Sequence, residues 1–231
     1  AAIETADLAG LNTANVRAME TADVSALTTD QIVALNSQQL GALTSAQVRA
    51  LSTDQIVAIE TADLRAMSTA QVAALKTEQV AALTTDQVTA LTTAEVRVLN
   101  TANVQALSTD QIVALDSTQV ATLSTAQVRA LSTDQIAAIE TADLRAMTTA
   151  QVAALKTDQV AALTTDQVTA LTTAEVRVLN TANVQALSTD QVVALDSAQV
   201  SALTTAQVRA LTTDQVAAIE TADLAGLNNT T

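Results

Sequence analysis

The chain has 231 residues and carries a net charge of −14 at pH 7, from 24 acidic and 10 basic side chains. It has no Phe, Trp, Tyr, His, Cys or Pro and only three Gly, yet 49% of its residues are hydrophobic. Without Cys and His, the usual zinc, haem and iron–sulfur sites, disulfides and histidine catalysis are excluded. We therefore expect no catalytic residue, no cofactor and no metal site.

Two kinds of partner also conflict with the composition. Binding to nucleic acid needs clustered Lys and Arg and aromatic side chains for stacking, which this chain lacks. Thr or Asp interrupts the apolar residues every few positions, so no stretch approaches the roughly 20 apolar residues of a membrane span. We expect neither nucleic-acid binding nor membrane insertion.

From Ile3 onward the sequence divides into octads, beginning IETADLAG, LNTANVRA, METADVSA and LTTDQIVA. Residues 3–226 hold 28 octads, and residues 227–231 form a tail. Position one is always Leu, Ile or Met, and position six is always Val, Ile or Leu. Position three is always Thr or Ser, and position five is always Gln, Asp, Glu or Asn. No linker interrupts the array, so we expect a single solenoid domain over 3–226.

The octad period suits neither a continuous helix nor a regular strand. Eight residues at about 100° each would wind an apolar stripe around a helix by about 80° per octad, and the apolar positions do not alternate as in a strand. A helix of about six residues followed by a bend fits, and such a short helix needs neighbours for stability. The sequence predicts an all-α superhelical solenoid with one helix per octad. The alternative is a β-solenoid, which Thr and Val favour.

Two registers are open for the helix start. The Thr or Ser at position three can act as the N-cap, whereas a cap at position two would form a capping box, Thr/Ser-x-x-Gln/Glu. We prefer position three, because position two also holds Lys76, Lys156 and several glutamates. The predicted N-caps include Thr5, Thr29, Thr53, Thr85, Thr109, Thr133, Thr165 and Thr189.

A longer period indicates the superhelical turn. Residues 51–106 and 131–186 match almost letter for letter, 80 residues or 10 octads apart. Acids at position four recur every three octads, with one single-octad step in each ten. If ten octads make three turns, a turn holds about 3.3 octads, and these acids share one face of the solenoid.

The acids of this face are candidate surface-binding residues. They are Asp30, Asp54, Asp86, Asp110, Asp134, Asp158, Asp166, Asp190 and Asp214, with Glu78 in the same series. The simpler interpretation is that acids in the first helical turn favour the helix dipole. Calcium is only a weak, disfavoured ligand, because no Asp-x-Asp-x-Asp-Gly loop is present.

The octad unit, as in Leu83–Leu91 (LTTDQVTAL), resembles the octapeptide arrays of large bacterial secreted and cell-surface, adhesin-like proteins. This resemblance implies an extracellular or cell-surface location. A shorter segment, Leu51–Ile59 (LSTDQIVAI), is similar to the helix opening of transcription-activator-like effector repeats. The 34-residue period, Gly-rich loop and basic surface of those DNA readers are missing, so their DNA binding is not implied.

Together these features predict a non-enzymatic structural protein. We expect an elongated rod that serves as a stalk, spacer or filament subunit, with a second copy as a partner through head-to-tail stacking of solenoid ends. The alternative is a binding module that recognises a glycan, cation, ice or mineral surface through its Thr/Asp face.

Overall fold

A computed structural model describes residues 4–219 and residue 223, and every structural statement below concerns these residues. They form short α-helices and contain no strand. Contacts divide the chain into two compact units, residues 1–115 and 116–231, and each unit is described by itself. The single domain over 3–226 therefore stays a prediction, and its tail at 227–231 lies outside the described residues.

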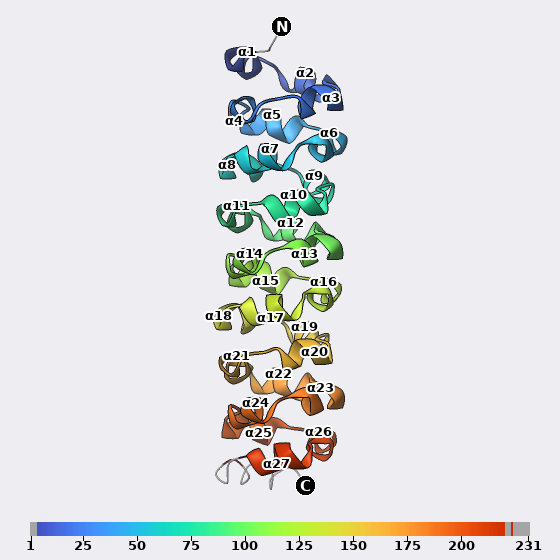
Figure 1. The fold of residues 1–231 in the computed structure, drawn as a ribbon, viewed down its shortest axis with the longest axis vertical. Coiled ribbons are helices and arrows are strands. Elements are labelled where there is room, and N and C mark those ends of the chain that lie inside the picture. The colour runs from blue at the N-terminus through green and yellow to red at the C-terminus, as the bar shows by residue number, and fades with distance from the viewer. Residues whose placement is uncertain (1–3, 220–222, 224–231) are drawn as a thin grey trace. The chain divides into compact units, whose positions relative to one another are not determined.

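Each unit is a solenoid of short helices that follow one another along the chain (Figure 1). The helices of the first unit are α1 (Thr5–Ala9), α2 (Thr13–Ala18), α3 (Thr21–Ser25), α4 (Thr29–Val33), α5 (Ser37–Ala42), α6 (Ser45–Ala50), α7 (Thr53–Ala58), α8 (Thr61–Leu64), α9 (Thr69–Ala73), α10 (Thr77–Ala82), α11 (Thr85–Ala90), α12 (Thr93–Val98), α13 (Thr101–Ala106) and α14 (Thr109–Val113). Those of the second unit are α15 (Ser117–Thr122), α16 (Thr125–Ala130), α17 (Thr133–Ala138), α18 (Thr141–Leu144), α19 (Thr149–Ala153), α20 (Thr157–Ala161), α21 (Thr165–Ala170), α22 (Thr173–Val178), α23 (Thr181–Ala186), α24 (Thr189–Val193), α25 (Ser197–Ala202), α26 (Thr205–Ala210) and α27 (Thr213–Ala218). The predicted all-α solenoid with one helix per octad is confirmed, and the β-solenoid alternative is wrong.

The bend between helices consists of two extended residues, at positions one and two of the octad. At Leu51 the backbone has φ −60° and ψ 142°, and at Ser52 it has φ −74° and ψ 165°. No described residue has a positive φ. Because all L-residues adopt these angles readily, the array bends at every octad without Gly or Pro.

The apolar residues of positions one and six form the core of each unit. Val48 and Ile136 are 0% exposed, and Leu51 is 2% exposed. Each such side chain contributes about 1.5–3 kcal/mol through burial. The helices themselves are too short to supply this stability alone, so packing between turns holds them in the helical conformation.

Helices pack on the helices three octads before and after them in the same unit. Thus α7 contacts α4 and α10, and α20 contacts α17 and α23. Hydrogen bonds between turns join residues 25 to 31 positions apart, as for Arg65 with Ala90 and Gln79 with Leu51 and Val48. A turn therefore holds between three and four octads, in agreement with the predicted value of about 3.3.

The preferred cap register is wrong by one residue. The predicted caps Thr5, Thr29, Thr53, Thr85, Thr109, Thr133, Thr165 and Thr189 are the first residues of their helices, and the N-caps are Glu4, Thr28, Ser52, Thr84, Ser108, Ser132, Thr164 and Ser188. The hydroxyl of Ser52, for example, accepts from the backbone N–H of Gln55 at 3.1 Å. The capping box is the register that the structure adopts, because the Gln side chain returns to the cap N–H.

A buried glutamine ladder as the candidate functional site

Position five of the octad places a polar side chain inside each unit. The glutamines found there from Gln39 onward are at most 3% exposed. They are held as residue N3 of each helix, pointing inward beside the buried residue at position six. A buried amide is stable only if its oxygen and its two N–H groups find partners, so their hydrogen bonds define the site.

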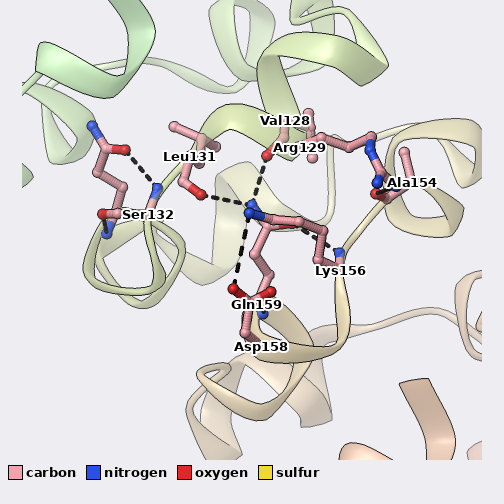
Figure 2. A network of polar contacts seen from close by, with 9 residues as sticks. Val128, Arg129, Leu131, Ser132, Ala154, Lys156, Asp158 and Gln159 are labelled. Carbon is pink, nitrogen blue, oxygen red and sulfur yellow. Dashed lines mark hydrogen bonds and ion pairs between the residues drawn. The ribbon is translucent and has the colours of Figure 1, made fainter. Parts of the chain in front are cut away.

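Gln159 shows the complete pattern (Figure 2). Its Oε1 accepts from the backbone N–H of Lys156 at 2.9 Å, within its own octad. Its Nε2 donates to the carbonyl oxygens of Val128 and Leu131, both at 2.8 Å, in the preceding turn. One side chain thus fixes the start of its own helix and ties it to the turn before.

Of the two carbonyl groups that receive these bonds, that of Leu131 needs its bond, whereas that of Val128 also accepts from the backbone N–H of Leu131 at 3.2 Å. Leu131 lies in an extended bend, outside the helices on either side, so no helical N–H reaches its carbonyl oxygen. An unpaired backbone carbonyl in the interior costs about 1–3 kcal/mol. The glutamine of the next turn supplies the missing donor.

The same two inter-turn bonds recur in both units, to carbonyls 28 and 31 residues earlier. Glutamines that make both within one unit include Gln39, Gln47, Gln55, Gln71, Gln79, Gln87 and Gln111 in the first unit, and Gln151, Gln159, Gln167, Gln191, Gln199, Gln207 and Gln215 in the second. We call this set the glutamine ladder. Its regular repeat makes the ladder a periodic structural element of the solenoid.

A second set of bonds joins neighbouring turns near the surface. Arg65 Nε donates to the carbonyl oxygen of Ala90 at 3.1 Å, 25 residues later, and Arg49 Nη1 donates to that of Ala74 at 3.2 Å. Thr89 Oγ1 takes the same role toward Ala114 at 3.0 Å. Position seven therefore bonds forward along the solenoid, whereas position five bonds backward.

In at least one octad of each unit, position five is an Asp that takes another partner. Asp143 is 6% exposed, and its Oδ1 accepts from Ser117 Oγ at 2.5 Å, 26 residues earlier. Ser37 with Asp63 repeats this contact in the first unit. Ser117 occupies position three of its octad, where most octads have Thr. In these two pairs, serine at position three and aspartate at position five are matched between adjacent turns.

The predicted surface acids lie outside the ladder. All ten are exposed, and they sit in the first turn of their helices. Their helices are stacked, because α4, α7 and α10 pack in sequence, as do α11 with α14, α17 with α20, and α21 with α24 and α27. We call these stacked, solvent-exposed carboxylates the acid columns.

Sequence reasoning assigned position five only to the first helical turn and did not predict the ladder. The residue types at position five carried the signal of a buried polar role, since this position holds amide or carboxyl side chains throughout the 28 octads. A solvent-exposed helix position would also accept Lys, Ala or Thr.

The described residues contain no group of three or more His, Cys, Asp or Glu side chains that could hold a metal ion. None of the helices in the described ranges has the length and apolar content needed to cross a membrane.

The helical stack and its internal hydrogen-bond ladder define this molecule as an α-solenoid repeat protein. Comparison with protein families gives the particular class. The model of the ALTTAQ repeat matches residues 1–37, 32–58, 56–93, 93–125, 115–138, 136–173, 173–205 and 193–218, so the chain belongs to the ALTTAQ repeat family. The motif appears literally at Ala202–Gln207, where it spans the N-cap Thr204 and the ladder residue Gln207. No curated protein matches the sequence.

Proposed function

We propose that this tandem-repeat protein is a non-enzymatic structural protein that forms an elongated rod, used as a stalk, spacer or filament subunit of a bacterial surface or extracellular structure. The observation that carries the proposal is the direction of bonding within each unit. Helices pack three octads backward and forward, and the glutamine ladder follows the same direction. A protein that bonds this way gains length with each octad and little thickness.

The proposed location comes from the octads themselves. Their likeness to the arrays of large bacterial surface proteins supports it, and the net charge of −14 keeps a long repetitive chain soluble. Surface labelling of the cells that produce the protein tests this point, and a signal confined to the cell interior would contradict it.

Small-angle X-ray scattering tests the rod. A compact protein of this length has a radius of gyration of about 17 Å. We expect a clearly larger radius and a pair-distance distribution with a long tail. A radius near the compact value with a symmetric distribution would overturn the proposal.

Head-to-tail stacking of the rod ends is the proposed partner contact. Each turn repeats the same bonding groups toward the turn before it and toward the turn after it. The last turn of one copy could therefore bond the first turn of another, in an open, heterologous association. Fibres in negative stain at high protein concentration would support the filament role. Single rods at all concentrations would leave the stalk and spacer roles and remove the filament role.

A second candidate function is recognition of an extended surface by the acid columns. The observation that favours it is an open hollow beside one column, lined by Thr61, Ala62, Arg65, Asp86, Thr89 and Ala90. Carboxylate, guanidinium and hydroxyl groups together offer the donors and acceptors that a glycan requires. Glycan arrays, calorimetry with calcium and a thermal-hysteresis assay test this function, and no signal in all three would contradict it.

A further inference from the structure

Two consecutive octads in each unit depart from the glutamine ladder. Residues 91–107 read LTTAEVRVLNTANVQAL, and residues 171–187 have the identical sequence. Position five is Glu95 and then Asn103 in the first copy, and Glu175 and then Asn183 in the second. The helices concerned are α12 and α13, which pack on α9 and α10, and α22 and α23, which pack on α19 and α20 (Figure 1).

Glu95 accepts the hydrogen bond from the cap N–H, as a ladder glutamine does, but it makes neither of the two bonds to the preceding turn. Its Oε2 accepts from the backbone N–H of Thr92 at 2.6 Å and from the Thr92 hydroxyl at 2.8 Å. The side chain is 2% exposed, and its buried Oε1 has no hydrogen-bond partner. A carboxylate has no N–H to donate, so this octad makes no side-chain bond of the ladder type to the turn before it.

Glu175 makes the same contacts with its cap residue in the second unit. It is 2% exposed, and its Oε2 accepts from the backbone N–H of Thr172 at 2.7 Å and from the Thr172 hydroxyl at 2.8 Å. Two buried carboxyl groups in equivalent surroundings, 80 residues apart, therefore interrupt the ladder in the same way.

The asparagine of the next octad is one methylene shorter than glutamine and reaches one carbonyl only. Asn103 Nδ2 donates to the carbonyl oxygen of Leu75 at 3.1 Å, and Asn183 Nδ2 donates to that of Leu155 at 3.0 Å. Asn183 Oδ1 is buried without a partner. The glutamate and asparagine octads together give one inter-turn bond of the ladder type where two glutamines give four.

We infer that residues 91–107 and 171–187 are seams at which each unit opens first. Buried polar atoms without partners weaken the packed state, and opening returns them to water. Local opening of a solenoid starts where the interface between neighbouring turns is weakest. In a stalk the seams would release length under tension before the flanking turns yield, and this last step rests on the proposed function.

Hydrogen–deuterium exchange of the full chain, followed by mass spectrometry, tests the seams. The double variant Glu95→Gln with Glu175→Gln changes both identical copies, so peptides shared by the copies remain interpretable. In the unmodified protein we expect faster amide exchange in 91–107 and 171–187 than in 75–90 and 155–170. In the double variant the exchange at the seams should slow by about tenfold, because the new amides pair buried carbonyl groups.

The reverse change is the matched control. Gln79→Glu with Gln159→Glu places a carboxylate at intact ladder positions, and exchange in 75–90 and 155–170 should quicken by about tenfold. Seam exchange that matches its neighbours, or that does not slow in the Glu→Gln variant, would overturn the inference. So would a Glu→Gln variant of lower thermal stability, because the glutamates would then stabilise the packed state more than glutamines do. These outcomes are independent of the scattering test of the rod.

Discussion

A glutamine at position five has the length and the functional groups that its surroundings require. Its oxygen reaches the cap N–H three residues earlier, and its two amide hydrogens reach two carbonyl groups of the previous turn, as Gln79 does toward Lys76, Val48 and Leu51. Asn is too short to reach both carbonyls, and Glu has no hydrogens to donate. The side chain is therefore matched to the cap N–H and to the carbonyl group of position one, and it adds a second donor to the Val48 carbonyl oxygen, which also accepts from the backbone N–H of Leu51.

Replacing a ladder glutamine by an apolar residue should be strongly destabilising. Gln159→Leu leaves the N–H of Lys156 and the carbonyl groups of Val128 and Leu131 without this partner. We expect a loss of about 2–4 kcal/mol in the free energy of unfolding, measured by urea denaturation. Gln185→Leu is the matched control at an exposed position, where the change should be within about 0.5 kcal/mol. Equal effects of the two variants would contradict the ladder.

The Ser117–Asp143 contact makes a second prediction. Ser117→Ala leaves the buried carboxylate of Asp143 without its hydroxyl donor, so we expect a loss of about 1–3 kcal/mol. Asp143→Asn in the Ser117→Ala background should recover part of this loss, because it removes the unpaired charge. Thermal unfolding of the single and double variants measures both values. Strictly additive effects would argue that the two side chains do not interact.

At the scale of the helix, the start of each element is defined by its N-cap residue and by the capping box that Gln at position five completes. The octad predicted one short helix per repeat, and the acid spacing predicted the turn of about 3.3 octads. The cap was misplaced because positions two and three both carry Thr or Ser. Lysine at position two looked incompatible with a cap, yet the backbone N–H of Lys76 still donates to Gln79 Oε1 at 2.8 Å. This bond of the capping box uses the backbone N–H of the residue at position two, which every octad provides whatever its side chain.

The ladder itself could not be predicted from the octad alone. Its bonds join position five to positions one and six of octads three and four earlier, as for Gln159 with Leu131 and Val128. The length of the turn brings these octads near one another. Whether the side chain at position five points toward the carbonyl groups of the previous turn depends on the pitch of the solenoid and the tilt of its helices. Only the restricted residue choice at position five indicated a buried polar role.

Two neighbouring substitutions test the cap register. Ser132→Ala removes the hydroxyl that accepts from the N–H of Gln135 at 3.1 Å, and it should cost about 1 kcal/mol. Thr133→Ala changes the first helical residue and should cost little, because Ala has the higher helix propensity. Chemical denaturation of both variants gives the comparison. A larger loss in Thr133→Ala would restore the cap at position three.

A single turn should not fold when separated from the others. A peptide of residues 131–154 contains three helices and lacks the turns on which they pack. Because six-residue helices are unstable in water, we expect a far-ultraviolet circular dichroism spectrum without helical minima, whereas the full chain should show them. A strongly helical peptide would mean that local propensity, and not stacking, holds the helices.

For each unit as a whole, stability is a sum over turns and the bonds between them. Apolar residues at positions one and six supply the burial, and the ladder supplies the hydrogen bonds that make the interior compatible with extended bends. Aromatic side chains are absent, and the apolar part of the core consists almost entirely of Leu, Val, Ile and Met. The acid columns remain exposed and carry ten of the 24 acidic side chains of the protein.

The measurement that tests this account most directly is hydrogen exchange of glutamine side-chain amides, observed by NMR on the nitrogen-15-labelled chain. The account predicts one large, slowly exchanging group of side-chain amides from position five. It predicts a small, fast group that includes Gln38 and Gln185, which are exposed. Protection of the first group by about 100-fold or more would match buried, paired amides. If all glutamine side-chain amides exchanged at the rate of Gln185, the ladder would be contradicted.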